Sequence, residues 1–331
     1  MIRNDVRPAG YKGAVTAEVL KVLRDRRQHA STPGHRDDGH RVALVIEGGS
    51  SRGAYSSGMT IAIERLGLLP AFDAVYGSSA GSLNAAWLLC GRAEKTQHAW
   101  WDREIMGTTI SLRRALRRQP VVDTRYLVHT VYTQVMPMGF QEILDNPVEF
   151  HPIATDAITG RAVDLHDRIH DQATVQQALR ASTAMPILAG DPIMIDGHPY
   201  VDAGLSEAVP IRSALAQGAT HVVALRTKRA DETSSAPSRI ERMVASRWFA
   251  RHAPGTIDSW LRNDVFRAEE ELVLETHPAT LQIRPPIGSA DIGRTARRLD
   301  VLRAAVDIGR EAALTALAGC VAARGNEEPV G

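Results

Sequence analysis

The sequence predicts an α/β protein with a central, mostly parallel sheet flanked by helices. A short apolar strand is followed by an amphipathic helix, and this pair repeats at once in the same order. Further strand and helix patterns continue to about residue 318. With 331 residues and 44% hydrophobic content, the chain can bury a large core without disulfides or a structural metal.

Composition narrows the functional classes. The 39 basic and 38 acidic residues nearly cancel, so the chain offers no general field for nucleic acid. Cys90 and Cys320 are far apart and form no CxxC pattern, which favours a reducing compartment. The first residues contain no apolar signal-peptide core, and no apolar run is long enough to span a bilayer. We expect a cytoplasmic protein whose membrane contact, if any, is peripheral.

The first strand and helix pairs follow directly from the pattern. Residues 41–46 form an apolar run that ends in glycines, as a strand buried on both faces does. Apolar residues at helical spacing over 59–66 predict a helix that Gly67 closes. A second strand at 74–76 runs into Gly77–Gly81 and then into an apolar helix that reaches about Cys90.

The later elements are less regular. Hairpins are expected around Thr159–Gly160 and Asp196–Gly197, because such dipeptides favour tight turns. Helices are expected over 175–182, from Pro210 to Gly218 and over 299–317, and strands over 221–226 and 281–284. We divide the chain into an N-terminal extension (1–41, partly helical or flexible), an α/β domain (42–319) with a variable insertion at about 229–280, and a flexible tail (320–331).

The sharpest chemical signal is Gly77-Ser78-Ser79-Ala80-Gly81, placed between a strand and a helix. A serine nucleophile needs a tight turn that exposes its oxygen and small neighbours that make room for the turn. The following helix N-terminus also favours developing negative charge near Ser79. GxSxG by itself also fits an unreactive turn, so the motif needs support from elsewhere in the chain.

That support comes from a second glycine-rich turn, Glu47-Gly48-Gly49-Ser50-Ser51-Arg52-Gly53, directly after the first strand. Parallel neighbouring strands bring both turns together, and consecutive small residues let backbone N–H groups converge on an oxyanion. Phosphate binding is the competing interpretation, but Ala54-Tyr55 stand where a P-loop requires Lys-Ser/Thr.

A serine hydroxyl also needs a base. Asp202, in Tyr200-Val201-Asp202-Ala203-Gly204, ends a predicted strand and can point into a site at the sheet's end. A solvated turn aspartate is the alternative, and the nearby Asp196 fits that role better.

These three motifs, in this order, resemble the patatin-like phospholipase family over about residues 42–228. The resemblance implies a three-layer α/β fold and a Ser/Asp dyad that works without histidine, metal or cofactor. It implies that Ser79 is the nucleophile and Asp202 the base, that Gly48, Gly49 and Ser50 supply oxyanion N–H groups, and that Arg52 supports their loop. Two small residues depart from the family pattern: Ser50 and Ala203 each stand where glycine is usual.

The resemblance therefore predicts a serine acyl hydrolase that cleaves acyl esters of phospholipids or related lipids. Three alternatives stay open: a Ser-His-Asp esterase assembled from Ser79, Asp202 and His221, an acyltransferase acting on a non-lipid ester, and a catalytically silent module that binds lipid or protein. These residues are compatible with several acyl esters as substrate and with any oligomeric state.

Three weaker signals remain. His35, Asp37, Asp38 and His40 are metal-ligand types, but they lie in a polar linker with no rigid element. The basic stretch 112–118 fits either anionic lipid headgroups or an ordinary exposed helix face. Aromatic residues between Trp248 and Phe266 fit an acyl pocket, a lid or, as is commoner at such spacing, the core.

Overall fold

The computed structural model describes residues 9–117, 119–232 and 239–320. Its centre is one mixed sheet with the strand order β5-β6-β3-β2-β1-β7-β8, in which β4 pairs with β3 outside this path. The strands are β1 (Val42–Ile46), β2 (Ala74–Ser78), β3 (Glu149–Asp156), β4 (Ala162–Asp164), β5 (Ile193–Ile195), β6 (His198–Val201), β7 (His221–Leu225) and β8 (Thr280–Ile283). The strands β3, β2, β1, β7 and β8 run parallel, which confirms the predicted fold class.

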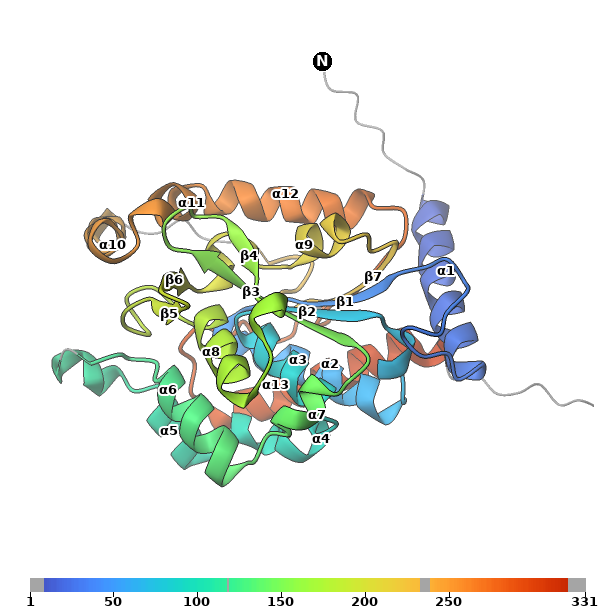
Figure 1. The fold of residues 1–331 in the computed structure, drawn as a ribbon, viewed down its shortest axis with the longest axis horizontal. Helices are drawn as coiled ribbons and strands as arrows, with labels where there is room; N and C mark the ends of the chain where they lie inside the picture. Colours follow the sequence, from blue (N-terminus) through green and yellow to red (C-terminus); the bar gives the residue numbers. More distant parts are fainter. Residues whose placement is uncertain (1–8, 118, 233–238, 321–331) are drawn as a thin grey trace, which may run out of the picture.

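Helices cover both faces of this sheet (Figure 1). The longer ones are α1 (Ala9–Gln28), α2 (Gly53–Arg65), α3 (Ala80–Leu89), α8 (Gln172–Ser182), α10 (Arg239–His252), α12 (Asn263–Thr276) and α13 (Leu299–Leu317). The shorter ones are α4 (Ala93–Thr96), α5 (Arg103–Thr109), α6 (Thr124–Tyr126), α7 (Phe140–Leu144), α9 (Ile211–Ala216) and α11 (Ile257–Leu261).

Successive side chains of β1 point to opposite faces of the sheet, and each face is covered by its own layer of helices. Leu44 and Ile46 pack into the core with α2, α3 and α13, whereas Ala43 and Val45 face α9 and α12 on the other side. All five residues of β1 are buried, because a parallel strand covered on both faces has no solvated side. In Figure 1, α9 and α12 lie above the sheet and α2, α3 and α13 lie below it.

Both predicted hairpins are confirmed: β3 pairs antiparallel with β4, and β5 pairs antiparallel with β6. The aromatic residues in the segment 248–266 are buried or partly buried. Phe249 is buried, with Trp260 at its edge, in a small cluster with Val201 and Leu205. This placement is that of a core cluster, and none of these side chains lines the pocket at Ser79 described below.

The helix α1 packs beside β7 and the edge strand β8. Its Val19 and Leu23 join the main core. Its Arg26 is buried and holds Asp38 at 2.6 Å and Asp73 at 2.8 Å. The Arg26 side chain, by hydrogen bonding, lowers the pKa of Asp38 to about 2. Residues 9–41, expected as an extension, thus contact the domain closely. Arg118 of the basic stretch, residues 233–238 of the expected insertion and residues 321–331 of the expected tail lie outside the described residues.

Within the described ranges, no helix combines the length and the apolar character that crossing a bilayer requires. Nor do any three His, Cys, Asp or Glu side chains of these ranges lie close enough together to hold a metal ion.

Candidate active site

Ser79 occupies a sharp turn between β2 and α3. Its backbone has a positive φ of 52° with ψ −124°, a conformation that a non-glycine residue rarely adopts. The glycines on both sides make the turn possible: a Cβ at Gly81 would lie 2.2 Å from the Ile46 carbonyl oxygen, and one at Gly77 would lie 2.5 Å from Ser82 Cα. The sequence motif is therefore a steric requirement of this turn.

Hydrogen bonds to serines of α3 and α8 hold the turn in place. The Ser79 N–H donates to Ser182 Oγ at 3.0 Å, and Ser82 Oγ donates to the Gly77 carbonyl at 2.7 Å. Ser82 Oγ also lies 2.7 Å from Ser182 Oγ. These contacts link α3 and α8, so the position of Ser79 is fixed by two helices.

Asp202 meets Ser79 although 123 positions separate them in the chain. The Ser79 hydroxyl donates to Asp202 Oδ2 at 2.6 Å, and the Gly204 N–H donates to Asp202 Oδ1 at 2.8 Å. Both side chains are nearly closed off, with Ser79 6% and Asp202 7% exposed. Asp202 follows β6, whose Val201 pairs with Thr155 on β3, and Thr155 Oγ1 donates to the Asp202 carbonyl at 2.8 Å.

The charge state of Asp202 is shifted by its surroundings. Burial raises its pKa, and the hydrogen bonds from Ser79 and Gly204 and the charges of Arg294 and Arg267 only partly oppose this, so the pKa stays above its ordinary value. A carboxylate with a raised pKa is a better proton acceptor than a solvated one.

The glycine loop lies against the Ser79 turn. A Cβ at Gly48 would lie 2.8 Å from the Ser78 carbonyl oxygen and 3.2 Å from Ser79 Cβ. The family resemblance implied that the Gly48 N–H binds an oxyanion. In the structure this N–H instead donates to the Ala208 carbonyl at 3.0 Å, so it is not free to do so. In the described part of the chain we find no acceptor for the N–H of Gly49 or of Ser50.

Arg52 lies beside this loop: its Nε would be 3.3 Å from a Cβ at Gly49. This Nε is buried and has no hydrogen-bond partner among the described residues. The Ser50 hydroxyl donates to the Arg294 carbonyl at 2.6 Å and the Ser51 hydroxyl to the same oxygen at 3.0 Å. The segment before α13 therefore also holds the glycine loop.

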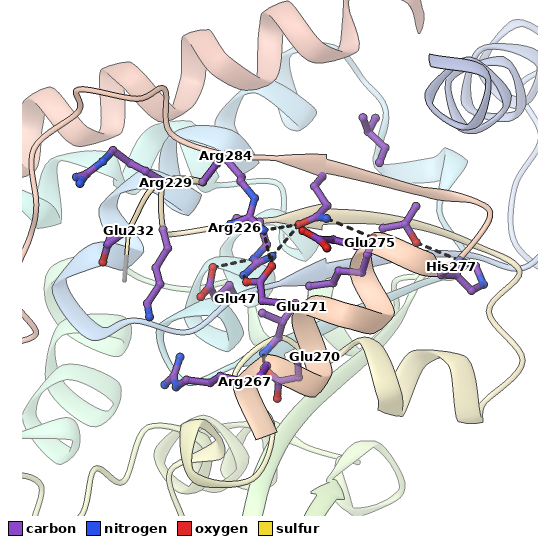
Figure 2. A pocket seen from close by; sticks show the side chains of 18 residues that line it. Glu47, Arg226, Arg229, Glu232, Arg267, Glu270, Glu271, Glu275, His277 and Arg284 are labelled. Atoms are coloured by element: carbon purple, nitrogen blue, oxygen red, sulfur yellow. Dashed lines mark hydrogen bonds and ion pairs between the residues drawn. The ribbon is translucent and has the colours of Figure 1, made fainter. Parts of the chain in front are cut away.

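A buried ion pair anchors the start of the loop. Glu47 Oε2 accepts from Arg226 Nε at 3.0 Å and from the Thr227 N–H at 2.7 Å, and the Thr227 hydroxyl donates to the Gly48 carbonyl at 2.7 Å. Burial alone would raise the pKa of Glu47, but Arg226 and the Thr227 N–H outweigh it and lower the pKa to about 2. Figure 2 shows Glu47 and Arg226 beside Glu271 in a charged pocket that α12 borders. This anchor was not predicted, because Glu47 and Arg226 are 179 positions apart.

An apolar pocket opens at Ser79. It is lined mainly by residues that follow the serine in the chain, among them Leu83, Trp87, Trp100, Ile105, Met106, Leu127 and Tyr132. None of these was singled out from the sequence, because they come from several separate helices whose apolar side chains meet only in the folded chain. The arrangement can hold an apolar chain next to a serine oxygen.

His221 does not belong to this site. It begins β7 and pairs in register with Val42 at the start of β1, whereas Ser79 follows the end of β2. Four strand residues at about 3.3 Å each place the two ends roughly 13 Å apart. His221 instead stacks edge-on against His40 at 4.4 Å between ring centroids. The Ser-His-Asp alternative is therefore wrong for this structure.

Comparison with known proteins agrees with the motifs. The model of the family described as "Patatin-like phospholipase" matches residues 44–215. "Uncharacterized protein YjjU" of Escherichia coli K12 is 28% identical over 197 residues, which cover 56% of this chain and 52% of that protein. Human "Patatin-like phospholipase domain-containing protein 6" is 30% identical over 227 residues, 65% of this chain and 16% of the human protein.

A solved structure, human GIVD cytosolic phospholipase A2 in complex with methyl gamma-linolenyl fluorophosphonate, overlaps 95% of this chain and 64% of that chain, with a TM-score of 0.46 and 11% identity. The chain spans about half the length of YjjU and a small part of the human relative. Since the family model matches more than half of the 331 residues, this chain belongs to the patatin-like phospholipase family.

Proposed function

We propose that this protein hydrolyses acyl esters of phospholipids or related lipids, with Ser79 as nucleophile and Asp202 as base. The observation that carries the proposal is the 2.6 Å hydrogen bond from Ser79 Oγ to Asp202 Oδ2 at the end of an apolar pocket. Membership of a family named for phospholipases supports the lipid substrate.

The first step forms an acyl-enzyme. Asp202 accepts the Ser79 proton as Ser79 Oγ attacks the ester carbonyl carbon, and the proton then passes to the departing alkoxide as the ester C–O bond breaks. The carbonyl oxygen becomes an oxyanion, for which the N–H groups of Gly49 and Ser50 are available donors, because they have no acceptor among the described residues.

The second step restores the enzyme. Water attacks the acyl-enzyme, Asp202 takes one of its protons, and that proton returns to Ser79 Oγ as the carboxylic acid leaves. Throughout, the apolar pocket holds the acyl chain, so esters with long chains are better substrates than short ones of the same headgroup.

Fatty acid release from a lysophospholipid and a phospholipid tests this proposal. We expect Ser79→Ala and Asp202→Asn each to lower kcat by roughly 10³-fold or more, because each removes a participant in the proton transfer. A fluorophosphonate probe should label Ser79 in the wild type, as peptide mass spectrometry would show.

His221→Ala is the matched control and should keep wild-type turnover, since His221 lies at the opposite end of the sheet. Melting temperatures establish that the variants fold. Wild-type protein that folds, binds lipid and releases no fatty acid would support a silent binding module instead. Transfer of the acyl group to an added alcohol in preference to water would point to an acyltransferase.

The rate should also report the ionisation of Asp202. Only its carboxylate form accepts a proton, so kcat/KM should fall as the pH drops through its pKa. Because burial raises that pKa above the ordinary value of an aspartate, the acid limb should lie at higher pH than for a solvated aspartate. A pH profile on a soluble ester measures this. A rate that stays constant down to pH 4 would contradict the assignment of Asp202 as base.

A further inference from the structure

A basic and apolar loop leaves the wall of the Ser79 pocket. Ile110 and Val122 both line this pocket and are joined by an antiparallel bridge. The Ser111 N–H donates to the Val121 carbonyl at 2.8 Å, and the Asp123 N–H donates to the Thr109 carbonyl at 2.8 Å. The two ends of the loop are thus fixed at the pocket wall, and the described residues 112–117 between them project outward.

We name residues 111–117 the mouth loop. Its centre is a 3₁₀ helix, Leu112–Arg117, which extends away from α5 and α6 at the left of Figure 1. None of the side chains of this helix is buried. The loop therefore contributes nothing to the core, and its composition needs another physical explanation.

Two leucines of the mouth loop face solvent: Leu112 is 53% exposed and Leu116 is 88% exposed. A third apolar side chain, Ile187, is 40% exposed on the neighbouring segment, whose Leu188 carbonyl accepts from the Val122 N–H at 2.9 Å. Exposed apolar side chains gathered in one place indicate an interaction surface, whereas isolated ones do not.

Charge identifies the partner. The sequence of the mouth loop, SLRRALR, contains three arginines and no acidic residue. Arg113 and Arg117 are exposed, while Arg114 is paired with Asp123 at 3.1 Å. Leucines flanked by arginines match a lipid surface whose headgroups are anionic and whose interior is apolar. A second copy of this chain would have to present an acidic face to the same loop.

We propose that the mouth loop docks the protein onto an anionic lipid surface, with Leu112 and Leu116 entering the acyl region and Arg113 and Arg117 contacting headgroup phosphates. This contact brings the wall of the Ser79 pocket to the bilayer and shortens the path of an acyl chain from the lipid to Ser79. The benefit for catalysis rests on the proposed function, but the docking itself is measurable without turnover.

Vesicle sedimentation with Ser79→Ala protein tests the docking, because this variant does not consume the lipid. We expect binding to phosphatidylcholine vesicles that contain phosphatidylglycerol, and weak binding to pure phosphatidylcholine. L112D/L116D should reduce binding by about tenfold or more. R113E/R117E should also reduce binding by about tenfold or more, and the difference between this variant and the parent protein should become smaller as salt is added.

Matched controls exist elsewhere on the surface. Leu272→Asp alters a leucine that is 60% exposed on α12, and K21E/R24E reverses two exposed charges on α1, at the opposite end of the molecule in Figure 1. Both controls should bind vesicles like the parent protein. Equal binding by the mouth-loop variants and the parent would overturn the proposal.

A second measurement separates docking from chemistry. With an active Ser79, the mouth-loop variants should hydrolyse a short soluble ester at the wild-type rate and vesicle lipid more slowly. If size-exclusion chromatography shows that L112D/L116D dissociates an oligomer while vesicle binding is unchanged, the loop is a contact between copies and the docking proposal fails. If the protein binds vesicles through the loop but cleaves no ester, docking stands and the proposed function fails.

Discussion

At the scale of single residues, the two departures from the family's glycine pattern have different consequences. Ala203 begins a 3₁₀ turn after Asp202 and lies buried without positive φ, so no glycine is required there. Ser50 has a φ of 53°, in the left-handed region that costs an L-residue about 1 kcal/mol. The loop accepts this cost, and the Ser50 hydroxyl gains a hydrogen bond to the Arg294 carbonyl.

Comparing two substitutions at Ser50 isolates this cost. Ser50→Gly and Ser50→Ala both remove the hydroxyl, but only alanine keeps a Cβ in the left-handed conformation. We expect the glycine variant to have the larger free energy of unfolding, by about 1 kcal/mol in urea denaturation. Equal stabilities would mean that the loop does not hold this φ in solution.

At the scale of elements, the crossing of α2 and α13 supports the glycine loop from beneath the sheet. A Cβ at Gly58 on α2 would lie 1.9 Å from the Val306 carbonyl oxygen, and one at Gly309 on α13 would lie 2.0 Å from the Tyr55 carbonyl oxygen. The two helix backbones therefore touch directly. The predicted stripe of the last helix is confirmed in part by buried Leu302, Val306, Ala313 and Leu317.

Replacing Gly58 by alanine should separate these helices. Although alanine is the better helix former, we expect Gly58→Ala to lower the free energy of unfolding by ~2 kcal/mol or more through overpacking. Gly107→Ala on α5 is the control, because nothing lies within 4 Å of a Cβ there. It should be neutral or slightly stabilising. Thermal and urea unfolding would measure both, and a stable Gly58→Ala would contradict the close crossing.

At the scale of the whole molecule, buried acidic groups lie under the site, and their ionisation links folding to pH. Glu270 on α12 accepts from the N–H groups of Ala208 at 2.9 Å and Val209 at 3.2 Å. Burial raises its pKa to about 7, against the opposing charges of Arg267 and Arg212. Ala208 in turn accepts from the Gly48 N–H, so Glu270 helps to hold the glycine loop.

The contribution of Glu270 to the free energy of unfolding should therefore fall as the pH rises. The folded state binds the Glu270 proton more tightly than the unfolded chain, whose carboxyl has a pKa near 4.5. Between about pH 4.5 and about pH 7 the unfolded state binds fewer protons, and the free energy of unfolding decreases with pH, by up to ~3 kcal/mol.

Urea denaturation across this range, compared between wild type and Glu270→Gln, measures the contribution. The difference between the two curves should change with pH. Glu269→Gln, at the exposed neighbouring position, should run parallel to wild type. A Glu270→Gln curve that also runs parallel would show that Glu270 keeps an ordinary pKa.

Much of this molecule follows from local pattern. The strand before Gly48, the Ser79 turn and the two hairpins are each encoded within about ten residues, because apolar runs, close-packed glycines and tight turns act over that distance. The pairing of Ser79 with Asp202 could be expected only from the order of the motifs.

What the sequence by itself determined is therefore the α/β class, the turn that presents Ser79 and the residues near it. The tertiary structure decided which groups meet. It pairs the Gly48 N–H with the Ala208 carbonyl and Glu47 with Arg226. It also separates His221 from Ser79 and forms the apolar pocket. The physical reason is that burial, pKa and hydrogen-bond partners depend on sheet register and helix packing between segments far apart in the chain.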